Sequence, residues 1–196
     1  MKKRKGFFAE QYSRSWRFIV ESRNFVYSIV GIFLAFSLLS YFVHPPESVS
    51  RQIIDFIMEL LERTKDMNQR ELIGFIFLNN LQSSFFGMIL GIFFGIPSVM
   101  VALINGYLLG FVANLVVGSE GILSLLRLFP HGIFELPAVF VSLGMGLKIG
   151  SFVFREKRLK CLKDYMSNSA RVFFFVVIPL LLTAAIIEGS FIYAFR

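Results

Sequence analysis

Long apolar segments alternate with short polar ones along most of the chain. An α-helix needs about 20 predominantly apolar residues to cross the hydrocarbon core of a bilayer. Five segments are long enough and apolar enough to do so. The pattern therefore predicts five transmembrane helices, at residues 25–43, 72–94, 97–117, 131–154 and 172–194.

Two further segments have an amphipathic pattern. Residues 7–23 mix aromatic side chains such as Trp16 with arginines such as Arg17, which is typical of a helix lying among lipid headgroups. In residues 47–70, apolar side chains recur at helical spacing between acidic ones. This second segment is too charged to cross a membrane, so we expect an amphipathic helix outside the bilayer core, packed on the membrane or on the bundle.

Composition supports this interpretation. Of the 196 residues, 56% are hydrophobic and only 17% are charged, whereas soluble domains carry about 25% charged residues. We therefore expect an all-α fold, a polytopic membrane bundle of about five transmembrane helices with amphipathic interfacial helices. Residues 1–24 form a basic amphipathic segment at the cytoplasmic interface. Residues 25–194 form a single membrane domain, which includes the extracytoplasmic helix at 47–70.

The net charge of +7 comes mainly from two basic blocks that flank apolar spans. This arrangement indicates membrane orientation and not a nucleic-acid partner. Five spans place both blocks, residues 1–24 and 155–171, on the same side of the membrane. The positive-inside rule then predicts a multi-pass protein of the cytoplasmic membrane, with the N-terminus inside and the C-terminus outside.

Ionisable residues inside the predicted spans are the clearest sign of a functional site. His131 and Glu135 are four residues apart and so share one face of a helix, directly before Pro137. Glu188 lies in the last span. A charged side chain at bilayer depth costs at least ~2.5–3.5 kcal/mol, so such residues usually face a protein interior, a partner or water.

Further polar residues accompany this trio in the second and third spans. With a rise of about 1.5 Å per residue, the trio and several of these side chains fall at similar depths in the outer half of the bilayer. We expect them to support a polar site from neighbouring helices. The supporting residues are Asn79, Asn80, Asn105, Tyr107 and Asn114.

Three chemistries are consistent with such a cluster, and the sequence leaves all three open. His131, Glu135 and Glu188 are acceptable ligands for zinc, with one position left for water. The two glutamates are also suitable for proton or ion passage. Alternatively, a hydrogen-bonded His–Glu–Asn network locks the helices together.

Small residues also recur at four-residue spacing, at Ser83, Gly87, Gly91 and Gly95, and again at Gly106 and Gly110. Such stripes let two membrane helices approach closely, either within one chain or between two chains. The apolar face of the 47–70 helix also needs a partner. We therefore predict a homodimer.

Four stretches of the sequence resemble the stage II sporulation protein M family of integral membrane proteins. They are FLNNLQSSFFGMILGIFFGIPS (77–98), INGYLLG (104–110), PHGIFELPA (130–138) and AAIIEGSFI (184–192), and the resemblance spans residues 20–194. It implies a helical bundle in the cytoplasmic membrane. The sporulation-type members work with partner proteins in envelope remodelling, so the resemblance implies an anchor or scaffold with envelope protein partners.

The sequence thus favours a scaffold or subunit of an envelope-associated membrane complex that carries a polar intramembrane site. A transporter for a small solute or ion is the first alternative. No H-E-x-x-H, G-x-S-x-G or Walker A motif occurs, so a non-enzymatic role is favoured. An intramembrane metal-dependent hydrolase is the second alternative.

Overall fold

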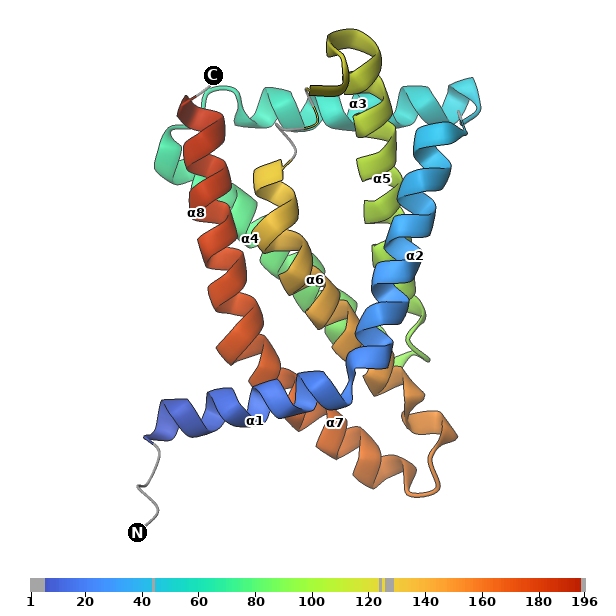
Figure 1. Cartoon of the computed structure of the whole chain (residues 1–196), viewed down its shortest axis with the longest axis vertical. Coiled ribbons are helices and arrows are strands. Elements are labelled where there is room, and N and C mark those ends of the chain that lie inside the picture. The colour runs from blue at the N-terminus through green and yellow to red at the C-terminus, as the bar shows by residue number, and fades with distance from the viewer. Residues whose placement is uncertain (1–5, 44, 124, 126–128, 195–196) are drawn as a thin grey trace.

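In a computed structural model the chain folds into a helical bundle (Figure 1). The structure describes residues 6–43, 45–123, 125 and 129–194, without the side chains of residues 120 and 129–134. The α-helices are α1 (Phe7–Glu21), α2 (Arg23–Phe42), α3 (Glu47–Thr64), α4 (Gln69–Ile89), α5 (Ile96–Glu120), α6 (Phe129–Gly150), α7 (Arg158–Val172) and α8 (Ile178–Ala194). Short 3-10 turns follow α4 and α6, at Leu90–Ile92 and Ser151–Phe154.

The predicted fold class is confirmed. Five helical segments are long and apolar enough to cross a membrane, and none of the described residues forms a strand. The five segments are Arg23–Phe42, Gln69–Ile92, Ile96–Ser119, Glu135–Phe154 and Arg158–Ala194. Each contains or closely overlaps one of the spans predicted from the hydrophobic pattern.

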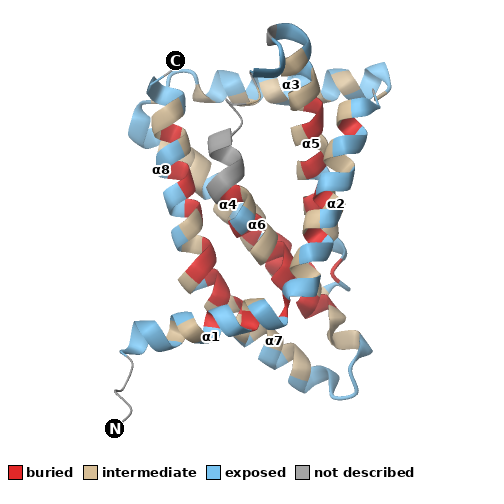
Figure 2. Cartoon of the chain, in the orientation of Figure 1, coloured by how far each residue is buried: buried red, intermediate tan, exposed pale blue. Residues whose placement is uncertain are grey.

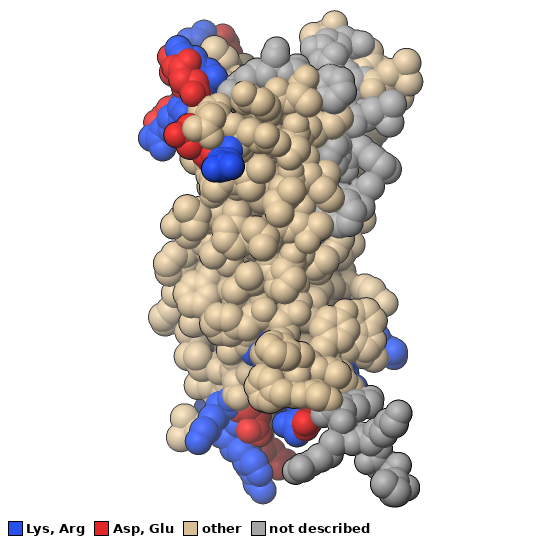
Figure 3. Space-filling view, turned by 90° about the vertical axis from the view of Figure 1, so that its left-hand side faces the viewer, with Lys and Arg blue, Asp and Glu red and all other residues tan. Residues whose placement is uncertain are grey.

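The amphipathic helices lie at the two ends of the bundle. Helices α1 and α7 lie at the end where the N-terminus is found, and α3 lies across the opposite end, near the C-terminus (Figure 1). Between these ends, the surface in Figure 3 is a broad band without charged residues. The distribution matches a protein whose middle is immersed in lipid and whose ends lie at the two interfaces.

The segment after the fourth span differs from the prediction. Residues 155–171 were predicted only as a basic block between two spans, with no helix of their own, but most of them form α7. Arg158, Lys160 and Lys163 of α7 are exposed. On the other face of the helix, Leu162, Tyr165 and Met166 pack against the buried core. A π-helical segment, Phe173–Val177, joins α7 to α8. Such segments interrupt the regular hydrogen bonding of a helix and are a recognised cause of bends.

Helix α6 is the central helix of the bundle. In the membrane-spanning segment of α6, 56% of the residues are buried, whereas this share is 17–39% in the other four segments. Figure 2 shows buried residues following α6 toward the α1 and α7 end. Leu143, Met145 and Ile149 on this helix are at most 1% exposed.

Glycines bring α4 and α6 into backbone contact. A Cβ atom on Gly146 would lie 2.7 Å from the backbone oxygen of Gly87 in α4. One on Gly91, in the 3-10 turn that directly follows α4, would lie 2.2 Å from the backbone oxygen of Gly146. At the turn before α5, Gly95 has a φ of +76°, which favours glycine over residues with a side chain. The small-residue stripe of α4 therefore packs within the chain, so this stripe provides no support for a dimer.

The second glycine pair has the same role between α2 and α5. Cβ atoms on Gly106 and Gly110 would lie 2.4 and 2.0 Å from the backbone oxygens of Phe33 and Ser37. Dispersion contacts between closely approaching backbones are a main source of stability between membrane helices. Glycines thus allow close backbone approach in both the α4–α6 and the α2–α5 pair.

Replacing Gly91 with alanine should destabilise the protein by about 1–3 kcal/mol, because the added methyl group collides with backbone and not with a flexible side chain. The control is Gly74→Ala in the same membrane-spanning segment, Gln69–Ile92, since a Cβ there meets nothing within 4 Å. Thermal unfolding in detergent should give a lower Tm for Gly91→Ala only. Equal Tm values for the two variants would contradict the proposed backbone contact.

Candidate functional site

A cavity of about 460 Å³ lies between the helices, beneath α3. Residues from α2, α3, α4, α5, α6 and α8 form its wall. Its polar lining comes from four different helices. These residues are Asn79, Asn80 and Ser83 of α4, Asn105 of α5, Glu135 of α6 and Glu188 of α8.

The rest of the cavity wall is apolar. Phe56 and Leu60 of α3 contribute to it from the end of the bundle, and Phe33 contributes from α2. The remaining apolar residues are Leu108, Leu109, Val112, Leu136, Val139, Phe191 and Ile192. The cavity therefore combines hydrogen-bonding groups with aliphatic and aromatic surface, which is the usual composition of a ligand pocket.

Helical periodicity explains which residues reach the cavity. On α5, Asn105 is followed by lining residues three, four and seven positions later, at Leu108, Leu109 and Val112. These spacings keep side chains on one face of a helix. On α4, Ser83 lies three and four positions after Asn80 and Asn79 and extends the same face.

The two glutamates are the most consequential residues of the site. Glu135 is only 4% exposed and Glu188 is half-buried, and both have interaction partners within the chain. The structure places both carboxyl groups on the wall of one cavity although 53 positions separate them in the sequence, from 135 to 188. Burying a carboxylate in apolar surroundings is costly unless polar groups accompany it, and the neighbouring asparagines supply such groups.

The side chain of His131 lies outside the described part of the structure. Its backbone belongs to α6, one turn before Glu135. Among the described residues, no three His, Cys, Asp or Glu side chains are grouped so that they could hold a metal ion. Two of the three proposed zinc ligands, Glu135 and Glu188, line the cavity.

Two of the supporting residues named from the sequence do not line the cavity. The amide nitrogen Nδ2 of Asn114 donates a hydrogen bond to the backbone oxygen of Tyr41, 2.9 Å away, and so joins α5 to α2. Successive residues of a helix are rotated by about 100°. Relative to Asn105, Asn114 therefore lies half a turn away around the helix axis, and Tyr107 is rotated by about 200°. Both residues share the depth of the site but not its face.

The sequence analysis missed the contribution of α3. Phe56 and Leu60 belong to the apolar face for which either the membrane or the bundle was the expected partner, and they contact the cavity. Ser83 was interpreted only as a small packing residue. Its position three or four residues after the two asparagines was the signal that it shares their face.

Comparison with protein families gives a match over most of the chain. The family described as Stage II sporulation protein M matches residues 25–191, which include all the polar residues of the cavity. No curated protein and no solved structure gives a significant match. The family match covers most of the chain, and five of its helices are apolar enough to span a membrane. The chain therefore belongs to the stage II sporulation protein M family of integral membrane proteins.

Proposed function

We propose that this protein is the membrane-embedded binding subunit of an envelope-associated complex, and that the cavity beneath α3 is its binding site. The observation that carries the proposal is the convergence of six polar side chains from four helices on one cavity of about 460 Å³. Membership of the stage II sporulation protein M family supports the proposal that this protein works with envelope protein partners.

The size of the cavity favours binding over a purely structural polar network. A network that only locked helices together would be close-packed, because protein interiors leave few voids larger than a water molecule. Ligand pockets usually measure about 300–1,000 Å³, and this cavity lies within that range. The polar groups therefore have room for a ligand beside them.

The lining indicates the chemistry of that ligand. Two carboxyl groups and three amide groups favour a partner that carries hydrogen-bond donors or positive charge. The phenyl and leucine side chains on the other walls favour an apolar portion. An amphipathic molecule or protein segment entering from the membrane combines the two.

The charge pattern supports an orientation for this site. Seven Lys and Arg residues lie in the first 24 positions and six lie between 155 and 171, so the α1 and α7 end carries most of the basic residues. We infer from the positive-inside rule that this end faces the cytoplasm. The cavity and α3 then belong to the outer half of the bilayer, on the side of the envelope partners.

A homodimer is the second part of the proposal. Because Gly87 and Gly91 are used inside the chain, the dimer contact would have to come from elsewhere. Helix α3 exposes apolar side chains at Ile54, Met58 and Leu61. This surface is the support for self-association at the outer end of the bundle.

A transporter fits the geometry less well. Along α6 the lining of the cavity ends at Val139, and the tightly packed residues Leu143 and Gly146 follow. In the described part of the chain, the cavity shares no lining residue with the pocket at the opposite end. A transport path would require this packed half to open.

Cysteine labelling tests the orientation. In a Cys161→Ser background, cysteines at Ser50 and Ser119 should react with an impermeant maleimide added outside intact cells. A cysteine at Ser167 should react only after permeabilisation, because the basic end lies inside. Equal labelling of positions 50 and 167 from outside would contradict the arrangement.

Accessibility of the cavity tests the binding function. In the same background, Ser83→Cys should react with a small cationic thiosulfonate, because position 83 lines the cavity beside two glutamates. Ser84→Cys is the matched control, since Ser84 is fully buried and does not line the cavity. A cationic reagent should react faster than an anionic one of similar size. Absence of reaction at position 83, or equal reaction at both positions, would refute an accessible polar cavity.

Elemental analysis separates a metal site from a hydrogen-bonded network. The zinc hypothesis predicts near-stoichiometric metal in protein purified without chelators, and its loss in His131→Ala and Glu135→Gln. The other histidine of the chain provides the control, His44→Ala, which should retain the metal. Well-folded wild-type protein without zinc would leave the network as the explanation of the cluster.

A further inference from the structure

A second cavity lies at the opposite end of the bundle, among α1, α6 and α7, and has the opposite charge. Its volume is about 790 Å³. The carboxylates of Glu21 and Asp164 are outnumbered in its lining by five cationic side chains. These are Arg14, Arg17, Lys148, Arg155 and Arg171. We refer to this cavity as the basic pocket.

Lys148 is the most buried cation of the basic pocket, with an exposure of 7%. Its Nζ donates a hydrogen bond to Oγ of Ser22, 2.8 Å away, and lies 3.9 Å from the ring centre of Phe18. Among the described residues, no carboxylate lies within ion-pair distance of this ammonium. An ammonium has three donors, so Lys148 retains hydrogen-bonding capacity toward the pocket.

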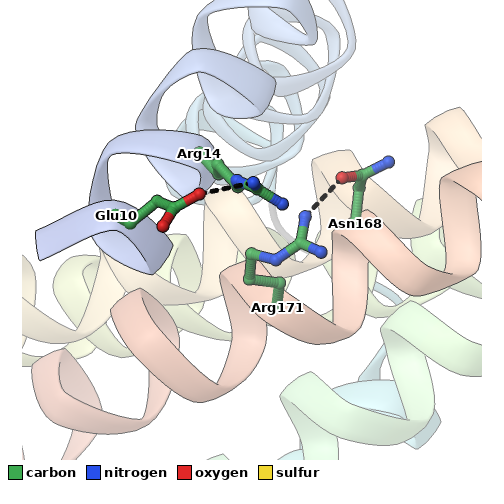
Figure 4. A network of polar contacts seen from close by, with 4 residues as sticks. All are labelled: Glu10, Arg14, Asn168 and Arg171. Carbon is green, nitrogen blue, oxygen red and sulfur yellow. Dashed lines mark hydrogen bonds and ion pairs between the residues drawn. The ribbon is translucent and has the colours of Figure 1, made fainter. Parts of the chain in front are cut away.

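Two arginines face one another across the pocket. Figure 4 shows Arg14 of α1 and Arg171 of α7 pointing toward each other. Arg14 pairs with Glu10, and Nη1 of Arg171 donates to Oδ1 of Asn168 at 2.6 Å. Of these two arginines, only Arg14 has an ion-pair partner among the described residues, so the facing guanidinium groups still favour an anionic ligand between them.

The pocket lies at the depth of lipid headgroups. Helix α1, which forms one wall, exposes Phe8, Tyr12 and Trp16 on its outer surface. Aromatic side chains of this kind mark the membrane–water interface. Apolar groups also line the pocket, at Phe18, Phe25 and Tyr165. A lipid at this position could place its headgroup among the cations and its chains along the bundle.

We propose that the basic pocket binds the phosphate group of an acidic phospholipid from the surrounding leaflet. The guanidinium groups of Arg14 and Arg171 match phosphate oxygens in pairs of hydrogen bonds, and Lys148 supplies a point charge at the base. A soluble phosphate shares this chemistry. The headgroup depth and the apolar part of the lining favour the lipid as its source.

Fluorescence of Trp16, the only tryptophan of the chain, provides the test. The protein is reconstituted in phosphatidylcholine vesicles that contain brominated phosphatidylglycerol or, in parallel, brominated phosphatidylcholine. Bromine quenches nearby tryptophan, so the ratio of quenching reports the preference for the acidic lipid. We expect a several-fold preference in wild-type protein that decreases as salt is raised.

Matched variants distinguish the pocket from general surface charge. Arg171→Gln and Lys148→Gln should abolish the preference. Lys160→Gln, an exposed residue of α7 that does not line the pocket, removes the same charge and should retain it. If Lys148→Gln does not fold, Arg171→Gln alone decides the question. Equal loss in Arg171→Gln and Lys160→Gln would refute a specific pocket.

Inorganic phosphate distinguishes the two sources of the anion. The lipid proposal predicts that phosphate competes only weakly, because it lacks the acyl chains that hold the headgroup at the pocket. Complete displacement of the lipid preference by phosphate, at constant ionic strength, would overturn the lipid assignment in favour of a soluble anion. Wild-type protein without any preference for phosphatidylglycerol would overturn the proposal as a whole.

Discussion

The backbone contact between α4 and α6 is the interaction on which the rest of the bundle depends. Glycines at 87 and 146 let the two helices touch in the half nearest α1 and α7, where side chains are closely packed. On the other side of this contact, α4 presents Asn79, Asn80 and Ser83, and α6 presents Glu135. The same helix pair therefore provides a close-packed half for stability and a hollow half for polar chemistry.

The cost of polar groups in lipid explains why the hollow half is where it is. Carboxyl and amide groups that faced lipid would lose hydrogen bonds to water without compensation, so they gather on a shared interior surface. Helix α3 adds Phe56 and Leu60 to that surface from the end of the bundle. A helix outside the membrane core thereby contributes to a site within it.

The two cavities have opposite charge. Among the described lining residues, the cavity beneath α3 carries two carboxyl groups and no Lys or Arg, whereas cations predominate in the basic pocket. A lipid bound in the basic pocket, as proposed, would anchor α1 and α7 relative to the bundle, because residues of α1, α6 and α7 line this pocket.

The sequence by itself determined the five spans and the interfacial α1 and α3, because span length and amphipathic periodicity are local properties of the chain. The rise of an α-helix per residue also predicted which polar residues lie at similar depths in the membrane. Only the tertiary structure decided which of them meet, since depth does not specify the direction in which a side chain points. Asn105 lines the cavity whereas Asn114 bonds to α2, and packing against neighbouring helices determines that direction.

The partner of the glycine stripe was equally undetermined, because a small residue allows close approach by any helix but does not select one. Helix α7 was missed for a related reason: its basic residues are typical of a loop, and only contact with the buried core favours the helix.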